Sequence, residues 1–408
     1  MASATAFPVD DGGAWDVSNT IKKSAPIDMG SSYDTTSLAG KMILITGGAS
    51  GFGAAFARKW AGLGAHIMIG DIDDAGGSAL AGELRALAGS SGHQHFQHCD
   101  VTRWEDLVAL FKAAAAVSPT GGIDAVVAAA GIIETNPPLE GRTFDMPGDL
   151  AADSPPPPRL KVLAVNLTGV SYTAHLALFW LPRNGPPKKE EEEDGPTEGG
   201  DKKSTRAQGP EPVRDRHLLL ISSIAGLAPL PGQTEYTVSK HAVMGLFRAM
   251  RGNAFRRGIR CNIICPYFVN TPLLPPIALG LLAGGGMAEM EDVVDAATRL
   301  VADESIVGRG LVVGPKMYVV DGDEHFEGDS PVVLGAARAT AAEDKQAVEA
   351  RQNEQRATWE IYAHDYEKVE VFVWRYIAMV NRIKAIRGFI GTIKDLYRLF
   401  ISRREKKK

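Results

Sequence analysis

The stretch Thr46-Gly47-Gly48-Ala49-Ser50-Gly51-Phe52-Gly53 decides the fold of this chain. It directly follows a short apolar run, Met42–Thr46, and directly precedes a helical pattern over Ala54–Ala61. Its glycines permit a tight turn and let an anion approach backbone N–H groups at the start of the helix, where the helix dipole favours negative charge. A strand, a glycine-rich turn and a helix in this order predict a dinucleotide-binding unit at the beginning of a parallel sheet.

An alternation of short apolar runs and helical patterns continues from this turn along most of the chain. Strands are predicted at His66–Asp71, Ala125–Ala130, His217–Ser222, Arg260–Cys265 and Leu311–Val320, and helices at Ala79–Ala88, Lys161–Trp180 and Tyr236–Arg256. Almost wholly apolar strands are typical of a parallel sheet whose two faces are covered by crossover helices. The expected fold class is therefore α/β, a doubly wound parallel sheet of the Rossmann type in one main domain.

Composition divides the 408 residues into a main domain and three additions. Residues 1–37 are expected to form a flexible arm, 38–322 the dinucleotide-binding domain, and 323–408 a helical, basic and amphipathic extension that takes no part in the sheet. Inside the main domain, residues 183–216 combine a run of glutamates with many glycines and prolines, a composition that cannot bury a core. This segment is predicted to be a disordered acidic insertion, with a regulatory or docking role as the alternative.

The global composition argues against several classes of function. A net charge of −5 does not suggest a nucleic acid partner. The cysteines Cys99, Cys261 and Cys265 cannot form a disulfide framework and suit a reducing compartment, so we expect a cytoplasmic location and, because no second ligand pair accompanies them, no metal site. The segment 1–37 lacks the layout of a secretory signal, and without an uncharged apolar run of about 18 residues no membrane-spanning helix is expected.

Asp71 ends the second predicted strand, near the spacing at which an acidic residue grips the ribose hydroxyls of a dinucleotide. A carboxylate there repels the 2′-phosphate of NADP, and neither the glycine turn nor position 72 carries Arg or Lys. NAD is therefore expected in preference to NADP. The alternative is that Asp71 is only a solvated strand end.

The segment Tyr236-Thr237-Val238-Ser239-Lys240 opens a predicted helix, so Tyr236 and Lys240 lie one turn apart on the same face. A neighbouring ammonium stabilises a tyrosinate and lowers the tyrosine pKa from about 10 towards the range of a useful general acid or base. Upstream, Ser222 and Ser223 close a buried strand, where the active-site groups of open α/β sheets gather.

With these residues the chain resembles the short-chain dehydrogenase/reductase family, which pairs a serine with a Tyr-x-x-x-Lys motif at a set distance. The resemblance covers Lys41 to about Gly322 with the insertion looped out. It identifies Ser223, rather than Ser222, with the catalytic serine, and Asn166 with the asparagine that carries a proton-relay water. It further implies cofactor contacts at Gly47, Ser50, Gly51, Phe52, Gly53, Asp71, Asp100, Val101, Ala130, Gly131, Tyr236, Lys240, Val269 and Thr271.

Two positions depart from the family pattern. Ala129 replaces the more usual Asn, which removes a side-chain hydrogen bond but keeps the turn to Gly131. Tyr267 replaces the usual Gly of the loop beside the nicotinamide, which narrows the site or changes that loop.

The resemblance implies hydride transfer between the nicotinamide and a secondary alcohol or ketone. In that mechanism Ser223 holds the substrate oxygen, Tyr236 takes or donates the hydroxyl proton, and Lys240 lowers the tyrosine pKa and binds the nicotinamide ribose. The segment Ser223–Arg251 looks closest to the NAD-linked 15-hydroxyprostaglandin dehydrogenase type, in which the residue matching Gln233 helps to hold the substrate hydroxyl. The chain also resembles fungal alcohol dehydrogenases of polyketide pathways, such as the hydroxyaverantin type, which implies a hydrophobic alcohol of lipid or secondary metabolism.

Two other functions stay open at this point. One is an NADPH-dependent ketone reductase, against which Asp71 argues. The other is a catalytically silent nucleotide-binding scaffold, against which the intact set of Ser223, Tyr236, Lys240 and Asn166 argues.

Two further segments bear on the substrate and on partners. Pro272–Met290 is apolar and rich in glycine, as expected of a mobile lid over a hydrophobic substrate or of a loosely packed surface loop. From Phe372 to Phe400 apolar residues recur at spacings of three and four between basic residues, which predicts a helix that lies on an anionic membrane surface or packs against protein. The family resemblance also implies a homo-oligomer.

Overall fold

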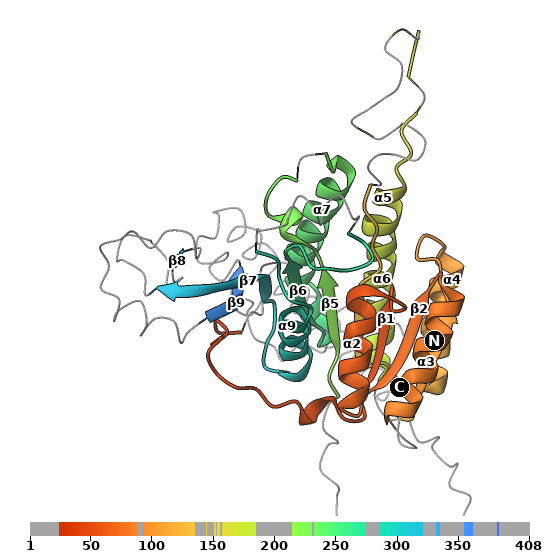
Figure 1. Cartoon of the computed structure of the whole chain (residues 1–408). Helices are drawn as coiled ribbons and strands as arrows, with labels where there is room; N and C mark the ends of the chain where they lie inside the picture. Colours follow the sequence, from red (N-terminus) through yellow and green to blue (C-terminus); the bar gives the residue numbers. More distant parts are fainter. Residues whose placement is uncertain are drawn as a thin grey trace, which may run out of the picture.

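A computed structural model describes residues 24–88, 93–134, 144, 151, 153–155, 157–184, 214–230, 232–274, 286–320, 332–334, 355–361 and 382 of the chain. These residues form one sheet with helices on both faces (Figure 1). The strands are β1 (Met42–Thr46), β2 (His66–Asp71), β3 (Gln94–His98), β4 (Ala125–Ala128), β5 (His217–Ile221), β6 (Arg260–Pro266), β7 (Gly310–Val320), β8 (Val332–Leu334) and β9 (Gln355–Ile361). The main helices are α2 (Gly51–Gly62), α3 (Asp74–Ala88), α4 (Trp104–Val117), α5 (Lys161–Leu163), α6 (Val170–Trp180), α7 (Thr234–Arg251) and α9 (Met290–Ala302).

The sheet topology confirms the doubly wound prediction. Within the described ranges the strand order is β3-β2-β1-β4-β5-β6-β7-β8, and β9 also pairs with β7. Neighbouring strands from β3 to β7 run parallel. The order reverses between β1 and β4, and open α/β sheets bind ligands outside the carboxyl ends of their strands at such a point.

The core has one layer on each face of the sheet. Buried side chains of α2, α3 and α9 pack on one face, and those of α4, α6 and α7 pack on the other. Every residue of β1 and β6 is buried, which explains why β1 is almost wholly apolar. The buried polar residues of β6, Arg260 and Asn262, are hydrogen-bonded. The indole N–H of the fully buried Trp60 in α2 donates to the Thr298 hydroxyl in α9 at 2.9 Å, which joins the two helices within their layer.

One long helical segment, Lys161–Arg183, consists of α5, a π-helical stretch η3 (Ala164–Gly169), α6 and a short 3-10 turn η4 (Leu181–Arg183). Among the described residues it is the helix that is long and apolar enough to cross a membrane by length and composition alone. Its part α6 contacts β4, β5 and α4. Packing inside the sheet's helical layer therefore accounts for its apolar character.

The C-terminal extension differs from its prediction. Residues 332–334 and 355–361 are strands that pair antiparallel with β7, so part of the segment expected to lie outside the sheet extends it. These partners form hydrogen bonds with backbone N–H and C=O groups of β7 that would stay unpaired if β7 were an edge strand. The sequence Thr358-Trp359-Glu360-Ile361 also favours a strand. The amphipathic segment 372–400 lies outside the described residues apart from Arg382.

The N-terminal arm is packed where the structure describes it. The Arg299 guanidinium of α9 lies 4.5 Å from the centre of the Tyr33 ring and donates to the backbone oxygens of Asp28 and Ser31. The backbone N–H of Ile27 donates to the Glu360 carboxylate of β9 at 2.9 Å. These contacts replace the expected flexibility over residues 24–37, while residues 1–23 lie outside the described part of the chain.

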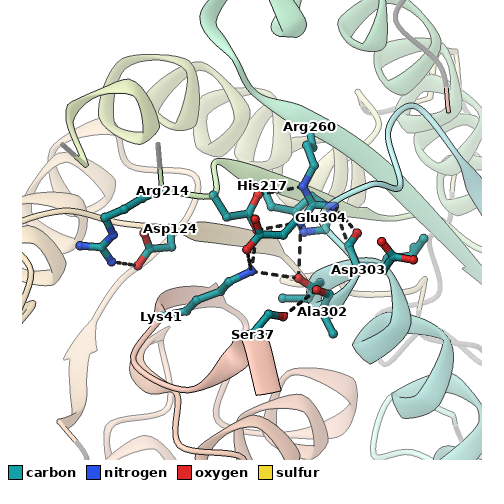
Figure 2. A network of polar contacts seen from close by, with 12 residues as sticks. Ser37, Lys41, Asp124, Arg214, His217, Arg260, Ala302, Asp303 and Glu304 are labelled. Atoms are coloured by element: carbon teal, nitrogen blue, oxygen red, sulfur yellow. Dashed lines mark hydrogen bonds and ion pairs between the residues drawn. The ribbon is translucent and has the colours of Figure 1, made fainter. Parts of the chain in front are cut away.

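The ends of the predicted insertion are hydrogen-bonded at the amino edge of the sheet, the edge formed by the N-terminal ends of its parallel strands. The Asn184 amide donates to the Asp124 carboxylate at 3.1 Å and to the backbone oxygen of Asp215 at 2.6 Å, and its own oxygen accepts from Arg216 at 3.0 Å. Arg214 pairs with Asp124 (Figure 2). The terminal residues of the segment 183–216 thus belong to the folded domain, and residues 185–213 lie outside the described ranges.

Asp215 is the centre of a buried charge network at this edge, whose cations Lys41 and Arg260 are labelled in Figure 2. Its carboxylate accepts two hydrogen bonds from Arg260, at 2.8 and 2.7 Å, and pairs with the Lys41 ammonium at 2.9 Å. Burial alone would raise the pKa of Asp215, but the two cations outweigh it and hold that pKa well below its usual range. Lys41 also pairs with Glu304, whose side chain is 48% exposed.

Replacing Asp215 tests how much this network contributes to the stability of the fold. Asp215→Ala is expected to lower the free energy of unfolding by about 3–5 kcal/mol at pH 7, because it removes the carboxylate that pairs with the buried Arg260 and leaves Lys41 with only the half-exposed Glu304. The carboxylate contributes fully above its unfolded pKa of about 4 and loses its contribution as the pH falls towards the folded pKa, so the difference from wild type should narrow below about pH 4. Denaturant unfolding over this pH range measures both effects.

Glu304→Ala is the matched control, because it removes an exposed partner of the same Lys41. Its cost should stay below about 1 kcal/mol. Equal losses for the two variants would show that the buried network adds nothing beyond an ordinary surface ion pair.

Candidate active site

The glycine-rich turn fits closely against the end of β4. A Cβ on Gly47, whose φ is +67°, would stand 2.4 Å from the Cα of Ala130, and a Cβ on Gly53 would stand 2.3 Å from the backbone oxygen of Gly47. Gly51 also has a left-handed φ of +51°. Only glycine fits these positions, so the turn presents bare backbone at the start of α2.

The first turn of α2 receives no side-chain cap from its N-cap residue. Ser50 is the N-cap residue, and its side chain makes no capping hydrogen bond in the described structure. Phe52 follows in the first turn and stacks on Phe56, with ring centres 6.3 Å apart. A helix N-terminus of this kind binds anions such as a pyrophosphate through its free N–H groups and its dipole.

The carboxylate of Asp71 lies beside this turn. One oxygen accepts the Ala49 N–H at 2.9 Å and the other accepts the Asp73 N–H at 3.1 Å. Asp74 follows at the start of α3, so the carboxyl end of β2 carries three acidic residues. The predicted ribose-binding residue is therefore held in place, in surroundings that repel a further anion.

The remaining predicted cofactor residues follow the ends of neighbouring strands. Asp100 and Val101 come after β3, where the Asp100 carboxylate accepts from the backbone and side chain of Thr102. Ala130 and Gly131 come after β4, and Val269 and Thr271 after β6. The structure thus brings these residues to one edge of the sheet.

The predicted catalytic side chains meet at the same edge. Ser223 follows β5, where its hydroxyl accepts the Ala225 N–H at 3.2 Å and contacts the Pro266 oxygen at 3.5 Å. Tyr236 lies in the first turn of α7, and its side chain hydrogen bonds with Ser223. The Lys240 ammonium lies 5.5 Å from the centre of the Tyr236 ring and donates to the Ile221 backbone oxygen at 3.1 Å. The serine, tyrosine and lysine therefore form one cluster.

Ser222 is used differently from Ser223. Its hydroxyl donates to the backbone oxygen of Lys240 at 3.0 Å and is buried. This bond joins the end of β5 to α7 and leaves Ser223 as the serine that reaches Tyr236.

The ionisation of Tyr236 and Lys240 differs from the expectation. Burial raises the pKa of Tyr236, the Ser223 hydrogen bond opposes this shift, and Cys265 adds to it. Burial lowers the pKa of Lys240 to about 8, against the opposing effect of Cys265. The predicted lowering of the tyrosine pKa is thus not the net direction here, because removal from water disfavours the charged form of both groups.

Asn166 lies in the π-helical stretch η3 and is fully buried. Its oxygen accepts the Ile132 N–H at 2.9 Å, and its nitrogen donates to the Ile132 oxygen at 2.8 Å and to the Ser239 hydroxyl at 3.2 Å. Single π-helical turns are frequent at functional sites. Here the turn directs the amide towards the loop after β4 and towards the catalytic helix.

Gln233 and Glu134 form a second amide-to-backbone pair on the same loop. The Gln233 oxygen accepts the Glu134 N–H at 3.2 Å, and its nitrogen donates to the Glu134 oxygen at 3.1 Å. The Glu134 carboxylate in turn accepts the Tyr236 N–H at 3.4 Å. Glu134 was not predicted as a site residue from the sequence. The available signal was a carboxylate that follows Gly131 and two isoleucines.

Two expectations about the site's surroundings receive only partial description. Residues 275–285, which make up most of the predicted lid Pro272–Met290, lie outside the described residues.

The described residues contain no group of three or more His, Cys, Asp and Glu side chains placed to hold a metal ion. All three cysteines are buried free thiols.

Comparisons with known proteins agree with this geometry. A sequence model of the family described as short chain dehydrogenase matches residues 41–183 and 217–279, leaving out the insertion. The 5'-hydroxyaverantin dehydrogenase stcG of Emericella nidulans is 36% identical over 311 residues, covering 71% of this chain and 89% of that protein. The 5'-hydroxyaverantin dehydrogenase of Dothistroma septosporum is 33% identical over 297 residues, with the same coverage of 71% and 89%.

A solved structure shows the same fold. The 3-ketoacyl-(acyl-carrier-protein) reductase from Brucella melitensis, complexed with NADH, matches with a TM-score of 0.51 at 24% identity, covering 68% of this chain and 97% of that chain.

The glycine-rich turn 46–53, called the glycine cradle below, fits a dinucleotide, and its close contacts provide a direct test. Gly53→Ala should weaken NADH binding by at least about tenfold, because its Cβ would collide with the backbone of Gly47. Fluorescence titration with NADH measures the affinity, and thermal unfolding checks that the variant is folded. Gly62→Ala is the matched control at the other end of α2, where a Cβ meets nothing within 4 Å. Equal NADH affinity for the two variants would contradict the assignment of the cradle.

Proposed function

The chain belongs to the short chain dehydrogenase family, and from that premise we propose that it is an NAD-dependent oxidoreductase that interconverts a hydrophobic secondary alcohol and its ketone. Membership of the family makes it an enzyme that uses a nicotinamide cofactor on CH–OH groups. The observation that carries the finer proposal is the cluster of Ser223, Tyr236 and Lys240 at the sheet edge that also holds the glycine cradle.

The contacts of these side chains support the proposed catalytic roles. Ser223 is placed to hold the substrate oxygen, since its hydroxyl bonds to the side chain of Tyr236. Tyr236 exchanges the hydroxyl proton with that oxygen as general acid or base. The Lys240 ammonium would bind the nicotinamide ribose; it lies beside the predicted cofactor residue Gly131, where a Cβ would stand 3.7 Å from Nζ. The bound nicotinamide supplies the hydride acceptor or donor.

Asn166 joins two segments next to the cluster, the loop after β4 and helix α7. Its amide is bonded to Ile132 and Ser239, so it fixes the loop after β4 relative to α7. In this proposal the π-helical stretch also holds the water that returns the proton to Tyr236.

NAD is proposed as the cofactor because of the charges at the end of β2. Asp71 is held beside the glycine turn by the Ala49 N–H, and Asp73 and Asp74 follow it. A 2′-phosphate would meet this group of carboxylates, whereas the ribose hydroxyls of NAD can donate to Asp71.

A hydrophobic substrate is proposed on two grounds. Apolar side chains follow the strands that frame the cluster, with Ile132 and Ile133 after β4 and Tyr267 and Phe268 after β6. The two fungal relatives are named for 5'-hydroxyaverantin, which favours a role in secondary metabolism. The narrower likeness to NAD-linked 15-hydroxyprostaglandin dehydrogenases, which depends on Gln233 and the residues around Lys240, is part of the same proposal.

Location and assembly are also proposals. The three buried free thiols suit a reducing compartment such as the cytoplasm. Family membership supports a homo-oligomer. A peripheral membrane contact through the segment 372–400 stays a prediction, since that segment lies outside the described residues.

Replacing the tyrosine tests the proposed function. Tyr236→Phe should lower kcat for oxidation of hydrophobic secondary alcohols by about 10²- to 10⁴-fold, because it removes the proton-transferring group. For the wild type the rate should rise with pH, since the raised tyrosine pKa moves the proton-accepting form to higher pH. Nicotinamide absorbance follows turnover with NAD and, separately, with NADP.

Tyr172→Phe, the same change on α6, is the control and should leave the rate unchanged. A wild type that prefers NADP would favour the NADPH-dependent ketone reductase instead. A wild type that binds NAD but turns over neither alcohols nor ketones would favour the silent scaffold.

A further inference from the structure

The loop after β4 is held by two amide side chains in the same manner. Asn166 bonds to both the N–H and the oxygen of Ile132, at 2.9 and 2.8 Å. Gln233 bonds to both the N–H and the oxygen of Glu134, at 3.2 and 3.1 Å. The two held residues are alternate positions of one short segment, so the segment is fixed along its length between η3 and the start of α7.

The start of α7 lacks a cap from its own N-cap residue. α7 begins at Thr234, and the N-cap residue Gln233 makes no side-chain hydrogen bond to the helix, because its amide is bonded to Glu134. The first backbone N–H groups of a helix have no partner within the helix and need one from elsewhere.

Glu134 supplies that partner from across the loop. Its carboxylate accepts the N–H of Tyr236 at 3.4 Å, a long hydrogen bond to the third residue of α7. Glu134 is only 7% exposed, and a carboxylate near a helix N-terminus is favoured by the helix dipole. The hydrogen bonds are therefore reciprocal. The Gln233 side chain bonds to the Glu134 backbone, and the Glu134 side chain bonds to the backbone of α7.

We propose that Glu134 and Gln233 form a reciprocal clamp that positions Tyr236 for proton transfer. The clamp acts on the backbone of the tyrosine, so both members are positioning residues and neither needs to touch the substrate. This inference rests on the proposed function, because it assigns the clamp to the proton-transfer step of that reaction.

The clamp makes a different prediction from the family resemblance, which assigns Gln233 to the substrate hydroxyl. If the Gln233 amide binds the substrate, its replacement raises the KM for the alcohol. If the amide positions Tyr236, its replacement lowers kcat, because small displacements of a catalytic group slow the chemical step more than they weaken binding.

A double-mutant cycle separates these outcomes. Glu134→Ala and Gln233→Ala should each lower kcat about tenfold with little change in the KM for NAD or for the alcohol. The double variant should also lose about tenfold rather than about a hundredfold, because the residues act as one unit. Glu134→Gln keeps an acceptor oxygen and should recover most of the lost rate.

Glu105→Gln is the matched control, since it removes an exposed acidic residue from the first turn of another helix, α4, and should leave kcat unchanged. Independent, multiplying losses would overturn the clamp, and so would a raised KM for the alcohol with unchanged kcat in Gln233→Ala. If Glu134→Ala does not fold, Gln233→Ala alone decides between the kcat and KM outcomes.

Hydrogen exchange tests the clamp without turnover. The amides of 234–237 should exchange at least about tenfold faster in Gln233→Ala and Glu134→Ala than in wild type or Glu105→Gln, because the first turn of α7 opens more readily. Unchanged exchange in these variants would contradict the clamp even in an active enzyme. Faster exchange in a protein that oxidises no alcohol would instead support the cap while removing the proposed reaction.

Discussion

The backbone of Gly47 lies against the backbone of Ala130, so closely that a Cβ on Gly47 would stand 2.4 Å from the Ala130 Cα. This contact joins the turn after β1 to the end of β4, at the point where the strand order reverses. The same turn is bonded to Asp71 through the Ala49 N–H, and Gly131, three residues beyond Ala128 at the end of β4, lies beside Asn166 and Lys240. This close backbone contact therefore joins the predicted cofactor turn to the strand end next to the catalytic cluster.

The two edges of the sheet use buried polar groups for different purposes. At the amino edge, Asp215 is fully paired with Arg260 and Lys41, and the network anchors both ends of the insertion. At the carboxyl edge, Tyr236 and Lys240 are removed from water, neither pairs with a carboxylate within the described ranges, and burial disfavours the charged form of each. Pairing stabilises the fold at one edge, whereas incomplete pairing leaves groups able to exchange protons at the other. The described end residues of the insertion, Asn184 and Asp215, thus lie at the opposite edge of the sheet from the catalytic cluster.

The sequence predicted the parts of the fold that depend on local patterns. The apolar runs located β1 and β2 to the residue, because the spacing of each motif reflects neighbouring backbone geometry. The glycine turn, Tyr236 and Lys240 predicted a candidate site whose residues the structure brings to one edge of the sheet. Contacts between residues far apart in the sequence could not be predicted from such local patterns. The pairing of β9 with β7, the packing of Tyr33 against Arg299, and the bonds between Gln233 and Glu134 all depend on which segments the fold brings together. The direction of the Tyr236 pKa shift was also missed, since it depends on burial in three dimensions rather than on the lysine one turn away.

The central claim is that this cluster moves a hydride between a secondary alcohol and the nicotinamide of NAD. The most direct measurement uses a panel of hydrophobic secondary alcohols deuterated at the carbinol carbon, incubated with the protein and NAD, with mass spectrometry of the dinucleotide. The account predicts that deuterium from at least one alcohol appears in NADH. A protein that binds NADH but transfers label from no alcohol, and from deuterated NADH to no matching ketone, would contradict it.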